Sequence, residues 1–139
     1  MAYKIFVDTS AWISYLGSDQ PRHINIKNLI KKYIKDGAVI CTSNDVIDET
    51  TTRLIYDTNI KIAEKFINLI KGGIKNHSLV QLWVDEEIQN EAFDSVQKFS
   101  EHKLSLTDAT TIVLVKRFNI ESIITLDSDF TKVGLRVLP

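Results

Sequence analysis

The chain has 139 residues, 44% of them hydrophobic and 25% charged, and its formal net charge is −1. These values fit one compact domain over residues 1–139 and exclude a disordered or fibrous chain. They also lack the large positive excess of many nucleic-acid binders, although the local distribution of charge matters more than the sum. The single cysteine, Cys41, excludes an internal disulfide. A secretory signal and a bilayer-spanning stretch are both absent, so we expect a cytoplasmic protein that does not contact a membrane.

Apolar runs and amphipathic segments alternate from the start of the chain. Tyr3–Val7 is a short apolar run that predicts a buried strand, and Thr9–Leu16 predicts a short helix after it. Ile24–Lys35 places apolar side chains at helical spacing and lysines mostly on the other face. This helix is expected to end at Gly37, and Ala38–Cys41 predicts a second strand.

The middle of the chain predicts two helices in succession. The run TSN at positions 42–44 offers three good N-cap residues for a helix through position 55. A further amphipathic helix is expected over about Asn59–Lys71, with a stop at Gly72 and Gly73.

The second half continues the same alternation. Leu79–Val84 predicts a third strand, and Asp85–Phe99 predicts a helix with acidic residues in its first turn. A helix from Ser105 to about Arg117 is apolar nearly all round in its interior and should be buried. Ser122–Leu126 and Leu135–Leu138 predict two more strands. Four or five strands separated by helices indicate an α/β fold, with a mainly parallel sheet sandwiched between helices on both faces.

Four acidic residues fall where such a sheet would bring them together. Asp8 ends the first strand and Asp127 follows the fourth, while Glu49 and Asp108 lie near the starts of two helices. Ligands of open parallel sheets bind outside the carboxyl ends of the strands, near the point where strand order reverses. These four side chains are therefore candidates for one site at that edge.

Each acid also has a purely structural explanation. Asp8 can cap the helix that follows it, and Glu49 can be a solvated charge on an amphipathic helix. Asp108 stands three residues after a serine, which is the spacing of a capping box. Asp127 and Asp129 can shape a turn in the run LDSDF.

The four acids together are harder to explain in this way. Carboxylates gathered within a few ångströms repel one another and raise one another's pKa. A divalent cation removes that cost, and oxygen-only ligands suit Mg²⁺ or Mn²⁺. The three histidines lack the spacing of zinc ligands. The pattern points to metal-assisted hydrolysis of a phosphodiester bond.

Four stretches, in this order, resemble the PIN domain family. They are VDTSAWI, DVIDETTTRL, SLTDATTI and IITLDSDFTKVGLRVLP, and the resemblance spans the whole chain. Among PIN proteins the chain is most similar to the small ribonucleases of VapC type, toxins of prokaryotic toxin–antitoxin pairs. The family's fold is a parallel sheet between layers of helices, which agrees with the elements predicted above.

The resemblance implies a site of four residues, each named here by its place in this chain. Asp8, Glu49, Asp108 and Asp127 would be catalytic, and the three aspartates would hold Mg²⁺ or Mn²⁺. Ser10 resembles the small polar residue that assists at this site in the family. Two further assignments stay open: Asp129 either joins the metal shell or faces solvent, and four cations could contact RNA phosphates, namely Lys27, Lys31, Arg53 and Lys103. A solvated helix face explains the lysines of positions 27–35 equally well.

The resulting expectation is a metal-dependent endoribonuclease that cleaves single-stranded or structured RNA. The resemblance also implies an antitoxin protein as partner and a homodimer. Two alternatives remain open: a PIN-like module that binds RNA or protein without cleaving, and a housekeeping RNA-processing nuclease. A receiver-like signalling domain would need paired acids at the first strand and a lysine after a late strand, and the sequence has neither.

Overall fold

A five-stranded sheet forms the centre of the computed structural model, which describes residues 3–139. Every pairing is parallel and the strand order is β3-β2-β1-β4-β5. The strands are β1 (Lys4–Val7), β2 (Val39–Ser43), β3 (Leu79–Leu82), β4 (Ser122–Ile124) and β5 (Val137–Leu138). The expected class, a parallel sheet between helices, is confirmed.

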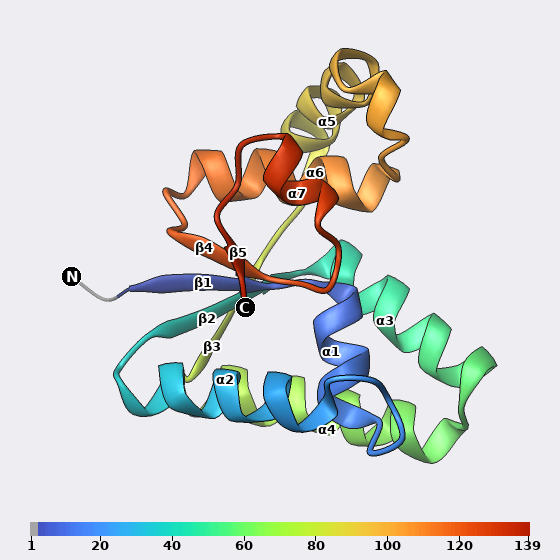
Figure 1. The fold of residues 1–139 in the computed structure, drawn as a ribbon, viewed down its shortest axis with the longest axis vertical. Coiled ribbons are helices and arrows are strands. Elements are labelled where there is room, and N and C mark those ends of the chain that lie inside the picture. The colour runs from blue at the N-terminus through green and yellow to red at the C-terminus, as the bar shows by residue number, and fades with distance from the viewer. Residues whose placement is uncertain (1–2) are drawn as a thin grey trace.

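Helices cover both faces of this sheet. In Figure 1, α1, α2 and α4 lie below the strands, while α6 and α7 lie above them with α5 packed against α6. The helices are α1 (Thr9–Leu16), α2 (His23–Lys35), α3 (Asn44–Asp57), α4 (Ile60–Lys75), α5 (Glu86–Lys98), α6 (Leu106–Arg117) and α7 (Asp129–Lys132), with a 3₁₀ turn at Ser100–His102. No helix within residues 3–139 is long and apolar enough to cross a membrane.

The core lies along the central strand and the helices that press on it. Ile5, Phe6 and Val7 are fully buried in β1, because a central strand of a parallel sheet is covered on both faces. The interior of α6 is buried from residue 109 to residue 115, as its all-round apolar sequence predicts. Trp12 packs against Phe66, with ring centroids 5.7 Å apart, and so belongs to the core.

The predicted stop of the fourth helix at Gly72 and Gly73 is wrong. The helix continues through both glycines to Lys75. A Cβ atom added at Gly73 would lie 2.9 Å from Cβ of Leu79, which is closer than real side chains approach. The glycine therefore allows α4 to pack directly on β3, and this contact outweighs the weak helix propensity of glycine.

Several predicted boundaries also shift, and one helix was missed. β3 ends at Leu82 instead of Val84, and Trp83 beyond it is 65% exposed. β4 ends at Ile124 instead of Leu126, and the short helix α7 was not predicted. Irregular backbone therefore begins two residues earlier at both strands than the apolar pattern suggests.

The order of strands reverses beside β1. The chain passes from β1 to β2 and β3 on one side, and then crosses to β4 and β5 on the other. The backbone N–H of Asp8 donates to the carbonyl of Ile124 at 3.1 Å, so the ends of β1 and β4 stay adjacent. This reversal of strand order is where parallel α/β proteins bind ligands.

Candidate active site

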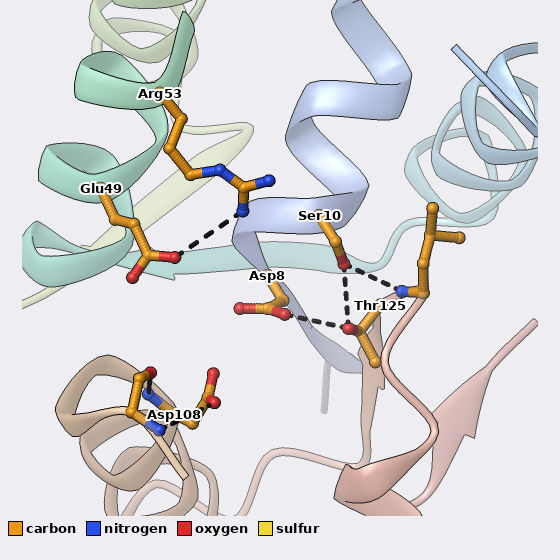
Figure 2. A network of polar contacts seen from close by, with 8 residues as sticks. Asp8, Ser10, Glu49, Arg53, Asp108 and Thr125 are labelled. Carbon is orange, nitrogen blue, oxygen red and sulfur yellow. Dashed lines mark hydrogen bonds and ion pairs between the residues drawn. The ribbon is translucent and has the colours of Figure 1, made fainter. Parts of the chain in front are cut away.

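Asp8 lies at the carboxyl end of β1 and is almost completely buried, with 4% of its surface exposed. It occupies the N-cap position of α1, yet its side chain makes no capping hydrogen bond. Its Oδ2 atom instead accepts a hydrogen bond of 2.9 Å from the hydroxyl of Thr125, beyond β4 (Figure 2). The capping explanation of Asp8 therefore fails, and its carboxylate is held toward the chain that leaves β4.

Thr125 is the centre of a hydrogen-bond network that joins α1 to the chain leaving β4. Its hydroxyl lies 3.1 Å from Oγ of Ser10 and accepts the backbone N–H of Asp127 at 3.0 Å. Ser10 Oγ in turn accepts the backbone N–H of Leu126 at 3.0 Å. Because the Thr125 proton is given to Asp8, Ser10 is the donor to Thr125. These bonds fix both the orientation of Asp8 and the position of the turn that carries Asp127.

Asp127 and Asp129 shape the turn that follows. Oδ1 of Asp127 accepts the backbone N–H of Asp129 at 2.9 Å, as expected of an aspartate in such a turn. The carboxylate of Asp129 pairs with Lys132 at 3.0 Å. The structure thus brings Asp127 to the network around Asp8 and pairs Asp129 within α7.

Glu49 and Asp108 approach the same space from two other helices. Glu49 lies on α3 and Asp108 on α6, and both carboxylates turn toward Asp8 in Figure 2. Asp108 completes the predicted capping box with Ser105, with bonds of 3.0 and 3.2 Å. Arg53, one turn after Glu49, lies 3.9 Å from its carboxylate. Asp108 therefore caps the N-terminus of α6 and also contributes its negative charge to the site.

Burial is the main reason that the pKa of Asp8 is raised, from 3.8 to about 7. Hydrogen bonds from the Thr9 backbone and the Thr125 hydroxyl lower it in part. The charges of Asp108 and Glu49 raise it further. At neutral pH, without a cation, this carboxyl group is close to half protonated.

The pKa of Asp108 is raised as well, and burial is again the largest cause. The hydrogen bonds with Ser105 oppose the rise, while the charges of Asp127 and Glu49 add to it. The charges of other members of the set thus contribute to the raised pKa values of Asp8 and Asp108. Like charges held in this way favour either a proton or a cation in the space between them.

The four acids fit a divalent cation in chemistry more than in their present geometry. Within residues 3–139, no three His, Cys, Asp or Glu side chains lie close enough together to hold a metal ion. The available donors are all carboxylate and hydroxyl oxygens, which suit Mg²⁺ or Mn²⁺ and not zinc. Mg²⁺ keeps several of its waters when protein carboxylates bind it, so a wide acidic site suits it.

The structure separates the four predicted RNA-contacting cations. Arg53 lies beside Glu49 at the site. Lys27 and Lys31 lie on α2, in the layer below the sheet in Figure 1, away from the helices that carry Glu49 and Asp108. Lys103 lies in the turn before α6, with a left-handed φ of 51°.

Two residues at the site were missed by sequence reasoning. Thr125 was missed although a polar residue near the end of an apolar strand run is a weak signal for such a role. Asp45, whose Oδ2 accepts a 3.1 Å hydrogen bond from Thr110, joins α3 to α6 and so sets the distance between Glu49 and Asp108. No local signal in the sequence indicates that contact.

The fold and the site define a parallel α/β protein with an acidic centre at its topological switch point. The family model for the PIN domain matches residues 5–135, nearly the whole chain. The chain therefore belongs to the PIN domain family, as its four sequence stretches indicated.

Two relatives from distant organisms match over most of their length. The "23S rRNA-specific endonuclease VapC20" of Mycobacterium tuberculosis is 27% identical over 131 residues, covering 94% of each protein. "Ribonuclease VapC6" of Methanocaldococcus jannaschii is 24% identical over 150 residues, covering 94% of this chain and 92% of that protein. Both relatives carry a nuclease name, which supports nuclease as the class of activity.

Solved structures agree with the architecture. The crystal structure of Mycobacterium tuberculosis VapC20, described as a "Sarcin-Ricin loop cleaving toxin", has a TM-score of 0.81 and 25% identity, covering 94% of this chain and 95% of that one. The structure of VapBC2 from Rickettsia felis bound to promoter DNA has a TM-score of 0.67 at 11% identity, covering 97% of each chain. The second similarity shows the fold alone.

Proposed function

We propose that this protein is a metal-dependent endoribonuclease of VapC type, the toxin of a toxin–antitoxin pair. The observation that carries the proposal is the mutual charge of the four acids at the carboxyl edge of the sheet. The pKa values of Asp8 and Asp108 are both raised, mainly by burial and in smaller part by the charges of the other acids. Such a cluster is costly without a cation, and a site for catalysis by a cation is the function that accounts for the cost.

Asp8, Asp108 and Asp127 would hold Mg²⁺ or Mn²⁺, and Glu49 would complete the site. When bound, such a cation lowers the pKa of water and stabilises negative charge on phosphate oxygens. The Thr125 hydroxyl would keep Asp8 aimed into the site through its bond to Oδ2, and Ser10 would orient Thr125. The hydrogen bonds around Asp8 and Thr125 involve no histidine. The protein's own contribution would be to hold the cation with its carboxylates and to orient Asp8.

RNA is the substrate that the relatives support, since one is named for 23S rRNA and another is named a ribonuclease. Arg53 is the cation best placed to contact an RNA phosphate, because it lies beside Glu49. Lys103 would contact the RNA backbone farther from the cleaved bond. An antitoxin protein that covers the acidic site and a homodimer complete the proposal, on the strength of the VapC resemblance.

The direct test is cleavage of single-stranded RNA with Mn²⁺ or Mg²⁺, with and without a chelator. Asp8→Asn and Asp127→Asn should abolish cleavage while leaving the circular dichroism spectrum unchanged. Asp94→Asn is the matched control, because Asp94 is an exposed aspartate of α5 outside the site. It should cleave as the wild type does.

A second readout is stabilisation by the metal alone. Mn²⁺ at about 100 times its dissociation constant should stabilise the wild type by about 2.7 kcal/mol. Asp127→Asn should lose most of this gain. Equal cleavage by the wild type and Asp8→Asn would refute the acidic site, and binding of RNA without cleavage would favour the non-cleaving PIN-like module.

A further inference from the structure

A cleft runs outward from the acidic site between α3 and the start of α6. Its volume is about 370 Å³, within the range of small-molecule sites. Glu49 belongs both to the cleft and to the acidic site, and Leu106 and Thr107 of its wall directly precede Asp108. The cleft therefore adjoins the site where the phosphate would be cleaved, with Glu49 shared between them.

The walls of this cleft are fixed relative to each other. Asp45 of α3 accepts a hydrogen bond from the Thr110 hydroxyl of α6 at 3.1 Å. The one proton of this hydroxyl is shared between Asp45 and the carbonyl of Thr107, which lies 2.9 Å from the Thr110 oxygen. The Thr111 hydroxyl donates to the same carbonyl at 2.9 Å. These bonds hold the first turn of α6 against α3, so that the cleft is largely preformed.

The chemistry of the lining changes along the cleft. The acidic side chains of the lining are Asp45, Asp48 and Glu49, all on α3, and Arg53 lies beside Glu49. The remaining walls are neutral: Leu106, which is 39% exposed, and the polar side chains of Thr52, Gln89 and Thr107. The acids disfavour a second phosphate, whereas a neutral group with hydrogen-bonding edges is acceptable.

We propose that the cleft binds one base of single-stranded RNA, next to the phosphate that is cleaved. This inference rests on the proposed ribonuclease function. The Gln89 amide offers both a donor and an acceptor to a base edge, and the Leu106 side chain offers an apolar surface to its face. Arg53 pairs with the phosphate of the same nucleotide, because a planar guanidinium can donate two parallel hydrogen bonds to phosphate oxygens. The cleft thus sets which nucleotide is accepted beside the cleaved bond.

The proposal is tested with a short single-stranded RNA of randomised sequence and Mn²⁺. Sequencing the product ends gives the nucleotide preference at each position around the cleaved bond. Gln89→Ala and Leu106→Ala are compared with Gln97→Ala, the matched control. Gln97 is an exposed glutamine two turns farther along α5, outside the cleft. Binding of the same RNA is measured by fluorescence anisotropy in the Asp8→Asn background, which cannot cleave under the proposed function.

The wild type should show a preference at one position flanking the cleaved bond. Gln89→Ala should reduce that preference about fivefold, the worth of one hydrogen bond, and leave the other positions and Gln97→Ala unchanged. Two outcomes would overturn the subsite but keep the ribonuclease: cleavage with no flanking preference, or a flanking preference that Gln89→Ala leaves intact. In either case the acidic lining would instead suit a basic side chain of a protein partner. Binding that depends on Gln89 without cleavage by the wild type would support the subsite and overturn the enzyme. Neither binding nor cleavage would overturn both.

Discussion

Replacing Asp8 by asparagine should stabilise the metal-free protein at alkaline pH. Burial raises the pKa of this carboxyl group from 3.8 to about 7. Above pH 7 the folded protein must carry a buried charge that the unfolded chain carries in water. Asparagine is neutral at every pH and can still accept the Thr125 hydrogen bond, so that it removes only the cost of the charge.

The magnitude follows from linkage. Since each pKa unit is worth about 1.4 kcal/mol, the rise corresponds to at most about 4 kcal/mol, and relaxation of the site reduces it to about 2–4 kcal/mol. A raised pKa means that the folded protein binds more protons than the unfolded one between pH 4 and pH 7. The wild type therefore loses this stability as pH rises from 4 through 7. Below pH 4 the carboxyl group is neutral in both states, and the difference from asparagine should vanish.

Urea unfolding with a chelator, at pH 4 and at pH 8, measures the effect. Asp8→Asn should exceed the wild type by about 2–4 kcal/mol at pH 8 and match it within about 0.5 kcal/mol at pH 4. The exposed Asp94→Asn controls for the loss of one negative charge and should change little at either pH. Destabilisation by Asp8→Asn at pH 8, or an equal effect at both values, would refute the reasoning from burial.

Substitutions at three further places test separate parts of the structure. Thr125→Val should lower metal-dependent RNA cleavage by about tenfold or more, because it removes a hydroxyl with three partners. Thr125→Ser keeps the hydroxyl and should cleave as the wild type does. Equal cleavage by the valine and serine variants would refute a positioning role for Thr125. Gly72→Ala should stabilise the protein to urea by about 0.5–1 kcal/mol, because nothing lies within 4 Å of the new Cβ. Gly73→Ala should instead destabilise it by about 1–3 kcal/mol through overlap with the third strand, so that changes of the same sign would contradict the packing argument. Arg53→Ala should weaken RNA binding and lower its salt slope by about 1, while Lys65→Ala on α4 should leave both unchanged in anisotropy titrations.

The alternation of apolar runs was sufficient to predict the fold class and most elements. β1 and α6 are clear examples, since one is a short β-branched and aromatic run and the other is apolar all round. The failure at Gly72 and Gly73 has a physical cause. A pair of glycines resembles a helix stop locally, but close packing of α4 on β3 requires a small residue within the helix. Such a requirement depends on a contact that a local pattern does not contain.

The acids were predictable because Asp8 ends a strand, Asp127 follows one, and Asp108 and Glu49 lie in the first and second turns of helices that begin at the same edge of the parallel sheet. The raised pKa values of Asp8 and Asp108 are caused mainly by burial and only in smaller part by the charges of the other acids. The catalytic roles of the four acids remain predictions. Thr125 could not be found in the same way, because threonine is common in strands for its β propensity alone. Its contact with Asp8 joins residues 117 apart in the chain.

The contact between Thr125 and Asp8 depends on strand register. Val7 pairs with Ile124, so the residues that follow each strand lie side by side at the site. A slip of one residue in this pairing would turn Thr125 toward the opposite face of the sheet and remove the donor from Asp8. Val7 and Ile124 are fully buried and oppose such a slip, because side chains of the slipped strand would have to repack against the helices on the opposite face of the sheet. The same apolar residues that stabilise the core therefore also hold Thr125 beside Asp8.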